Sequence, residues 1–273
     1  MFEDAIEKVS ASMRPVHTIM RKYKDQTIIP SSATLLFIND EGCAITTRSF
    51  ADMLIASSQM EKKYARFREE KNALKRDWHY EGKLKNLEAA YGYQPETPVQ
   101  IRSVFIDCVD SLSGYTCHKH PQYDLAILKF NDFKERKYQN HAILAKYGNS
   151  VRQGKFLCRL GYPFPEFSNF QFNQETDSIE WTGSGKMNSP RFPMEGMLTR
   201  FLADQSGKYG IELSTPCANP RGGGPLFDER GLIYGLQMVN RHMPQQDLHL
   251  GICLHVDIIK KFLDYHNIKY YTA

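Results

Sequence analysis

The chain has 273 residues, of which 41% are hydrophobic and 24% are charged, a composition typical of a folded globular protein rather than a disordered one. Its net charge of +4 is small for this length and does not by itself indicate a nucleic-acid binder. No stretch approaches the roughly 18 apolar residues of a membrane span, and the acidic start lacks the features of a secretory peptide. We therefore expect a cytoplasmic protein whose six scattered cysteines are reduced.

The first part of the chain alternates between predicted helices and strands. From Glu3 to about Tyr23, apolar residues recur at three- and four-residue steps, which predicts an amphipathic helix. A hairpin follows, with strands at Ala33–Ile38 and Cys43–Thr47 around an Asn-Asp-Glu-Gly turn. Residues 51–92 contain no proline, many strong helix formers and many opposite charges four positions apart, so we predict a helical insertion there.

From Val99 onward the pattern is that of a β protein. Short apolar runs are separated by Gly, Pro, Asn and Asp at a spacing typical of a sandwich or barrel. The stretch Phe164–Pro193, rich in Asn, Ser, Phe and Pro, is expected to be a long and mobile loop. Helical spacing of apolar residues between Val256 and His266 predicts a C-terminal helix.

Three motifs stand in a fixed order along the β-rich segments. The first is the run Gly42-Cys43-Ala44-Ile45-Thr46-Thr47-Arg48-Ser49-Phe50. The second is Tyr123-Asp124-Leu125-Ala126-Ile127-Leu128-Lys129. The third is Asn219-Pro220-Arg221-Gly222-Gly223-Gly224-Pro225-Leu226-Phe227-Asp228.

Together these motifs resemble the three triad segments of trypsin-like, HtrA-type serine proteases. The first resembles the segment that carries the catalytic histidine, the second the segment of the aspartate, and the third the G-D-S-G-G-P segment of the nucleophile. Two further stretches, Ser150–Pro163 and Gly251–Leu263, resemble the region between the two barrels and the closing strand and helix of the same family.

The resemblance implies a mainly β fold of two packed antiparallel β-barrels, with an N-terminal helix, a helical insertion and a C-terminal helix. We assign residues 1–30 to the N-terminal helix and its lead-in, and residues 31–273 to the double barrel. Within the barrel, the insertion covers about 51–92 and the second barrel begins at about 145.

The residues that carry the chemistry of the family are replaced. Ser49 stands at the position of the histidine and Gly222 at that of the nucleophile, whereas Asp124 matches the aspartate. Pro220 stands where an amide completes the oxyanion hole, and proline has no N–H. Arg221, where the family carries Asp or Asn, precedes Gly222 and Gly223 in a degenerate oxyanion loop. Acyl transfer needs a hydroxyl nucleophile, a base and oxyanion donors, so we expect no protease activity.

Other residues offer weaker routes to chemistry. Cys217 lies five positions before Gly222, and a lone cysteine is more often a small buried side chain than a nucleophile. His242 and His249 are expected to be exposed loop histidines. The cluster Cys117-His118-Lys119-His120 lacks the two-plus-two ligand spacing of a zinc site, so we predict neither a metal nor another cofactor.

Three functions follow from this pattern. The first is a non-catalytic pseudoprotease that binds a peptide or protein by β-addition along Leu236, Gln237, Met238, Val239 and Asn240. The second is nucleic-acid or acidic-partner binding through basic residues of the insertion, for which a solvated helical hairpin is the simpler reading. These residues are Lys62, Lys63, Arg66, Arg68, Lys71, Lys75 and Arg76. The third is residual hydrolysis through an unforeseen nucleophile.

Overall fold

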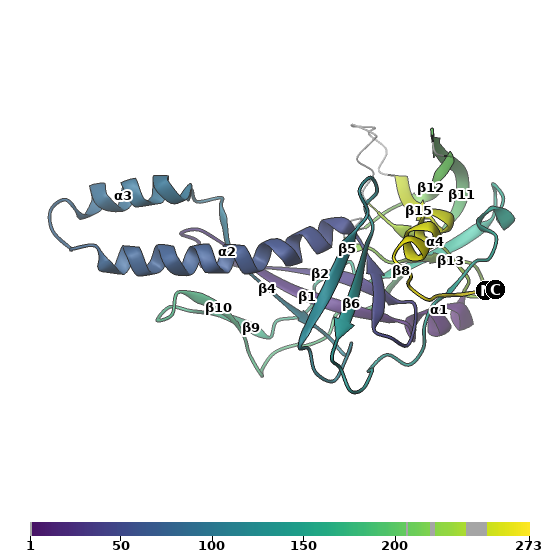
Figure 1. The fold of residues 1–273 in the computed structure, drawn as a ribbon, viewed down its shortest axis with the longest axis horizontal. Coiled ribbons are helices and arrows are strands. Elements are labelled where there is room, and N and C mark those ends of the chain that lie inside the picture. Colours follow the sequence, from purple (N-terminus) through teal and green to yellow (C-terminus); the bar gives the residue numbers. More distant parts are fainter. Residues whose placement is uncertain (1, 206, 219–221, 239–249) are drawn as a thin grey trace.

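The computed structural model describes residues 2–205, 207–218, 222–238 and 250–273. These residues form two large curled β-sheets, one from each half of the chain, a small two-stranded sheet and four α-helices. The sheets lie side by side, and a helical arm projects far from them (Figure 1). The expected fold class, mainly β with two packed barrels and additional helices, is confirmed.

The first sheet holds six strands in the order β4-β1-β2-β3-β6-β5. The strands are β1 (Met13–Lys22), β2 (Ile28–Phe37), β3 (Cys43–Thr46), β4 (Pro98–Phe105), β5 (Gly114–Lys119) and β6 (Ala126–Asn131). The sheet curls until Phe105 of β4 meets Tyr115 of β5, with ring centroids 5.7 Å apart. Apolar side chains such as Leu35, Phe37 and Leu128 fill its interior, so burial of the inward faces holds the curl.

The second sheet closes into a barrel. Its main strands are β8 (Phe156–Gly161), β11 (Phe192–Asp204), β12 (Gly207–Pro216), β13 (Pro225–Phe227), β14 (Ile233–Gln237) and β15 (Leu250–His255). Strand β13 pairs with both β8 and β14, which completes the ring. Two short strands, β7 (Ile143–Leu144) and β16 (Tyr271–Thr272), extend it beyond β14. The strands of this second sheet therefore begin at Ile143.

The N-terminal prediction is wrong beyond the first turns. Helix α1 covers only Glu3–Ser10, and β1 begins at Met13. Pro15 cannot continue a helix because it lacks an N–H, and the following Val16, Thr18 and Ile19 favour a strand. Strand β1 is buried on nearly all sides, so its sequence lacks the period-two pattern of a half-exposed strand. The first barrel thus starts at residue 13 and not at residue 31.

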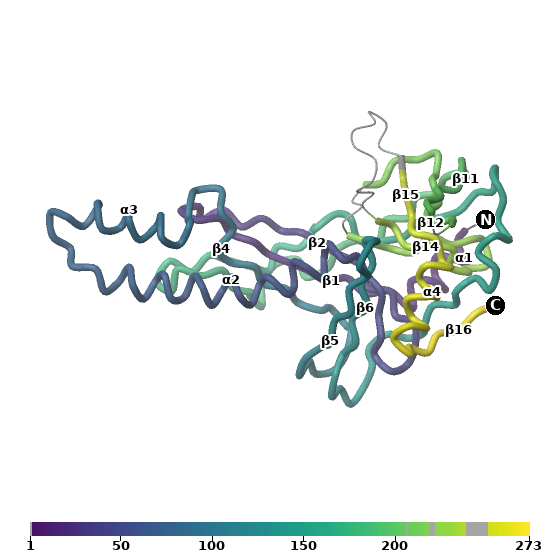
Figure 2. The backbone as a smooth tube through the Cα atoms, turned by 45° about the horizontal axis from the view of Figure 1, so that its top comes forward, coloured from purple at the N-terminus to yellow at the C-terminus, as the bar shows by residue number. Residues whose placement is uncertain are grey.

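The predicted helical insertion is present as the arm. Helix α2 (Arg48–Ala73) begins directly after β3 and α3 (Tyr80–Tyr91) returns antiparallel to it, as the tube in Figure 2 shows. The hydroxyl of Thr47 caps α2 by accepting a hydrogen bond from the N–H of Phe50 (3.3 Å). The arm packs on the long ends of β1 and β4 through an aromatic cluster that includes Tyr64 and Phe67. Because α2 begins at Arg48, Ser49 lies in its first turn.

The stretch Phe164–Pro193 is more ordered than predicted. It contains the hairpin of β9 (Phe170–Asn173) and β10 (Ser178–Trp181) before β11 begins. Asp177, in the turn of this hairpin, forms an ion pair with Arg21 of β1 (3.0 Å) and accepts a hydrogen bond from Tyr64 of α2 (2.5 Å). These contacts attach the hairpin to the arm.

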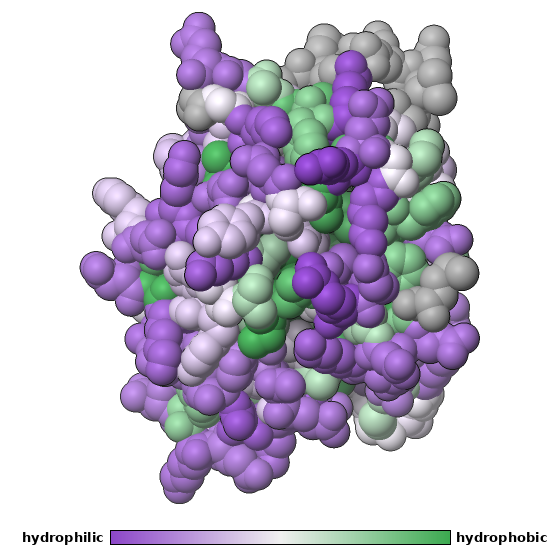
Figure 3. Space-filling view, turned by 90° about the vertical axis from the view of Figure 1, so that its right-hand side faces the viewer, coloured by the Kyte–Doolittle hydropathy of each residue, from purple (hydrophilic) through white to green (hydrophobic). Residues whose placement is uncertain are grey.

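The C-terminal helix is confirmed as α4 (Val256–Tyr265), which His255 caps by accepting a hydrogen bond from the N–H of Asp257 (3.2 Å). Both termini lie at the end opposite the arm (Figure 1), where hydrophilic side chains surround small apolar patches (Figure 3). Within the described ranges, no helix combines the length and the apolar character needed to cross a membrane.

Candidate functional site

The first two triad positions are in direct contact. Ser49 comes from the first turn of α2, and Asp124 lies two residues before the start of β6. Both the backbone N–H and the hydroxyl of Ser49 donate hydrogen bonds to Oδ1 of Asp124, at 2.8 Å and 2.9 Å. The Asp124 side chain is buried, with 5% of its surface exposed. The serine hydroxyl thus makes the bond to the aspartate that an imidazole makes in a serine protease.

The loop that carries Asp124 is tied to the start of α2. The guanidinium of Arg48 donates hydrogen bonds to the carbonyls of His120 (3.0 Å) and Pro121 (2.8 Å). Nδ1 of His120 accepts from the N–H groups of Gln122 and Tyr123, and burial lowers the pKa of this imidazole. His120 is therefore neutral near pH 7 and holds the loop in shape.

The Cys117-His118-Lys119-His120 segment, for which no metal was predicted, has side chains in different surroundings. Cys117 and His118 lie on β5, and the ring of His118 stacks on His266 of the C-terminal region, with centroids 4.1 Å apart. Among the described residues, no group of three His, Cys, Asp or Glu side chains has the arrangement of a metal site.

The glycine-rich segment is pressed into the seam between the two barrels. Gly222, Gly223 and Gly224 are buried, and the last two have positive φ angles of 69° and 128°. A Cβ on Gly223 would lie 3.4 Å from the methyl group of Thr47, next to the start of α2. A Cβ on Gly224 would lie 2.3 Å from the carbonyl oxygen of Leu160. The backbone conformation therefore requires glycine, and position 222 offers no side-chain nucleophile.

Two of the departures from the protease pattern cannot be placed. Pro220 and Arg221 lie outside the described residues, as do His242 and His249. Proline has no backbone N–H, so position 220 offers no hydrogen-bond donor whatever the loop conformation.

The predicted peptide-binding strand is partly described. Leu236 and Gln237 end β14 and pair with Leu254 and Cys253 of β15, and the N–H of Met238 continues toward Ile252 (3.2 Å). On the opposite edge, β13 covers β14 only as far as Leu236, which pairs with Pro225. The next bond on this edge joins the N–H of Gln237 to the carbonyl of Gly224 (2.8 Å). Val239 and Asn240 lie outside the described residues.

Two cysteines lie at this end of β14, and a buried arginine lies near one of them, Cys253. The side-chain amide of Gln237 donates to Sγ of Cys217, and Cys253 lies below on β15. Arg159, on β8, was missed by the sequence analysis because one arginine in the apolar run Phe156–Gly161 reads as a surface residue of a strand. Its side chain is only 1% exposed.

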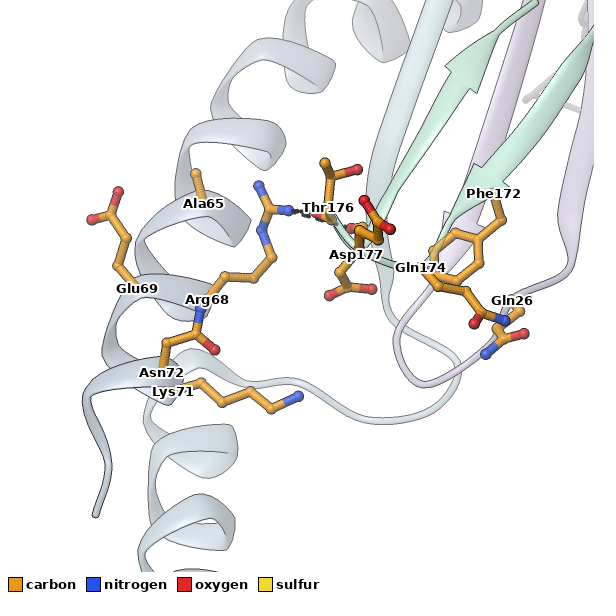
Figure 4. A pocket seen from close by; sticks show the side chains of 11 residues that line it. Gln26, Ala65, Arg68, Glu69, Lys71, Asn72, Phe172, Gln174, Thr176 and Asp177 are labelled. Carbon is orange, nitrogen blue, oxygen red and sulfur yellow. Dashed lines mark hydrogen bonds between the residues drawn. The ribbon is translucent and has the colours of Figure 1, made fainter. Parts of the chain in front are cut away.

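The basic residues of the insertion differ in their surroundings. Lys63 donates a hydrogen bond to the carbonyl of Tyr91 (2.7 Å) and so links the two helices. Arg68 donates to the carbonyl of Thr176 across a polar cavity of about 700 Å³, which Lys71 also lines (Figure 4). The remaining basic residues of the set are exposed: Lys62, Arg66, Lys75 and Arg76.

Comparison with known proteins identifies the fold. No protein-family model and no curated protein matches the chain. The structure is similar to the active form of the Rv3671c protease from M. tuberculosis, with a TM-score of 0.50, 11% sequence identity and coverage of 98% of this chain and 86% of that chain. It is also similar to the HtrA-type protease AlgW with a decapeptide, with a TM-score of 0.49, 12% identity and coverage of 98% of this chain and 68% of that chain. Both identities are low, and the likeness to the Rv3671c protease shows the fold alone, the trypsin-like fold of two barrels.

Proposed function

We propose that the protein is a non-catalytic trypsin-like domain that binds an extended peptide segment of a partner protein. The observation that carries the proposal is the hydrogen bond from the Ser49 hydroxyl to Asp124, together with glycine at position 222. The hydroxyl occupies the place of the base, yet a serine cannot accept a proton near neutral pH. Gly222 contributes no oxygen that could attack a carbonyl carbon.

The binding part of the proposal is supported by the incomplete cover of β14. Strand β13 pairs with β14 as far as Leu236, and Gly224 continues this cover to the N–H of Gln237. Among the described residues, Met238 is therefore the first position whose main-chain bond runs to the β15 side without a bond to the β13 segment. An extended peptide would add to the other edge through main-chain hydrogen bonds, as in β-strand addition. The loss of nucleophile and base leaves this edge intact, which makes binding without cleavage the favoured function.

Peptide titration followed by NMR tests this function. We expect the backbone amides of Gln237 and Met238 to shift on addition of extended peptides, whereas amides of α3 at the end of the arm stay unchanged. Peptides that carry N-methyl groups on every second residue provide a matched control, because only one of the two methylated phases removes the pairing N–H groups. Equal binding of both phases would contradict β-addition.

Residual hydrolysis is tested in the same samples. We expect no cleavage of casein and no labelling by a fluorophosphonate or by iodoacetamide at the site. Labelling of a single residue that disappears with its substitution, Cys217→Ala for instance, would replace the proposal by an active hydrolase. The contact of Cys217 with the Gln237 amide makes this thiol the first residue to check.

A second candidate function is supported by the tip of the arm. Trp78 lies between α2 and α3 with 88% of its side chain exposed, next to the exposed Lys75 and Arg76. Aromatic and basic side chains together bind single-stranded nucleic acid by stacking and by phosphate contacts. Anisotropy of a labelled oligonucleotide should then rise at low salt, and the Trp78→Ala variant should lose most of this binding. Phosphate contacts are strongest at low salt, so the absence of binding at roughly 20–50 mM salt would exclude this function.

A further inference from the structure

A polar cavity between the arm and the β9–β10 hairpin is not used by the proposed function. Its volume is about 700 Å³, and its walls come from the second half of α2, the end of the hairpin and the loop between β1 and β2. None of the residues that line it is buried, so a ligand can reach it from solvent. Small-molecule sites in proteins commonly have volumes of about 300–1,000 Å³, and the cavity has the size of such a site.

Two cations face the hairpin across this cavity. Arg68 and Lys71 extend from α2 toward the hairpin, whereas the neighbouring Glu69 points away from it (Figure 4). The guanidinium of Arg68 donates to the main-chain carbonyl of Thr176, which is a neutral acceptor. In the described part of the chain, neither Arg68 nor Lys71 forms an ion pair. Both positive charges therefore lack a carboxylate at contact distance among these residues.

The acidic groups around the cavity do not offset these two charges. The carboxylate of Asp177 is already bound by a cation from β1 and a hydroxyl from α2. Glu88, the acidic neighbour of Lys71 on α3, forms an ion pair with Lys24 (2.8 Å). Glu175, exposed in the turn of the hairpin, is the remaining carboxylate of the lining. Two cations against one exposed carboxylate give the cavity a positive balance, which favours an anionic ligand.

The rest of the lining suits a flat ring that makes hydrogen bonds at its edge. Three amide side chains contribute donors and acceptors that bond no other described side chain: Gln26, Asn72 and Gln174. The ring of Phe172 is half-buried, and the guanidinium of Arg21 lies over it at 4.8 Å from the ring centroid. Carboxamides form hydrogen bonds with the edges of nucleobases, and aromatic rings stack on their faces.

We infer that this cavity binds a nucleoside monophosphate, with the phosphate at Arg68 and Lys71 and the base among the amides and the ring of Phe172. An arginine binds phosphate oxygens through its N–H groups, and a lysine adds a compact positive charge. The cavity lies beside the arm, away from the end of β14 (Figure 1), so the inference does not depend on peptide binding. Trp78 at the tip of the arm does not line the cavity, and the site is distinct from the tip as well.

Isothermal titration calorimetry of the whole chain tests the ligand class. The ligands are the four ribonucleoside monophosphates, their nucleosides, ribose 5-phosphate and inorganic phosphate. We expect a monophosphate to bind at least about tenfold more tightly than its nucleoside, because the nucleoside lacks the charge-assisted hydrogen bonds. It should also bind at least about tenfold more tightly than ribose 5-phosphate, which lacks the stacked base. Binding no tighter than that of inorganic phosphate, or no binding of any monophosphate, would overturn the inference.

Substitutions of Lys71 test the place of the phosphate. Lys71→Met removes a charge of the cavity but no ion pair among the described residues, so we expect the fold to be kept and the monophosphate affinity to fall at least about tenfold. Lys71→Arg keeps the charge and should retain most of the affinity. Lys62→Met is the matched control, because Lys62 is an exposed cation of the same helix outside the cavity. Equal affinities of the wild type and Lys71→Met would overturn the inference.

Hydrogen exchange followed by mass spectrometry locates the bound nucleotide. We expect slower exchange of the amides of residues 68–72 and 174–177 in the presence of the tightest monophosphate, and unchanged exchange at Gln237 and Met238. Protection at the end of β14 instead would place the nucleotide at the peptide edge and overturn the inference. Loss of mononucleotide binding in Trp78→Ala would place it at the tip of the arm, with the same consequence. The NMR titration with peptides is read separately, so either proposal can fail while the other stands.

Discussion

The bond between Ser49 and Asp124 predicts a measurable stability difference with no catalytic effect. Ser49→Ala removes the hydroxyl bond of 2.9 Å and leaves the backbone N–H bond of 2.8 Å. A hydrogen bond to a charged group contributes about 1.5–3 kcal/mol, and the partly exposed serine places the expected loss at the lower end of this range. For a protein of this size, each kcal/mol lowers the melting temperature by about 2–4 °C.

Asp124→Ala removes both bonds at once, so we expect a larger loss of about 3–5 kcal/mol. In the Asp124→Ala background the Ser49 hydroxyl has no carboxylate to bind, so removing it costs little. The loss in the double variant should therefore be smaller than the sum of the two single losses by about 1–2 kcal/mol. Urea unfolding at pH 7, followed by circular dichroism, measures all four proteins of the cycle. Ser57→Ala is the matched control, because its partly exposed hydroxyl on the same helix bonds the backbone carbonyl of Leu54 (2.7 Å), and it should change stability by less than about 0.5 kcal/mol.

Two results would refute this reasoning. Strict additivity of Ser49→Ala and Asp124→Ala would show that the hydroxyl does not stabilise the carboxylate. A change in peptide affinity or the appearance of cleavage in Ser49→Ala would show that Ser49 acts on a ligand rather than on the fold.

Three further predictions concern chemistry, backbone and pH. The double variant Ser49→His, Gly222→Ser should leave chromogenic peptides uncleaved, because Pro220 still lacks the oxyanion N–H; burst release of product would refute this. Gly224→Ala should cost about 2–4 kcal/mol of unfolding free energy, since φ is 128° and the new Cβ meets a carbonyl, whereas Gly183→Ala, with open space around it, should cost at most about 1 kcal/mol in the same urea titration. Burial lowers the pKa of His17 from 6.5 to about 4. The folded protein therefore stays neutral at this site while the unfolded chain takes up a proton, so stability should fall as pH drops from 6.5 toward 4, and His17→Phe should show a shallower fall; equal pH slopes would contradict the assignment.

Much of the architecture followed from local patterns. The hairpin around Gly42, the helices of the arm and the C-terminal helix each have a strong local signal, and the structure has them. The segment from Met13 to Lys22 did not, because a strand buried on nearly all sides shows no alternation and its apolar spacing also fits a helix. The hairpin β9–β10 was missed for a related reason, since it is held by Asp177 against Arg21 rather than by a local turn signal alone.

The sequence by itself determined the identities at the site: serine, glycine and proline at positions 49, 222 and 220, each of which lacks the group that the chemistry needs. Only the tertiary structure decided what these and other residues contact. The Ser49 hydroxyl reaches Asp124 across 75 positions of the chain, and Arg159 reaches Thr215 across 56. Residue type fixes which donors and acceptors exist, but burial and pairing depend on strands that meet only when both barrels close. For this reason the glycine at position 222 could be read from the sequence, whereas the burial of Arg159 could not.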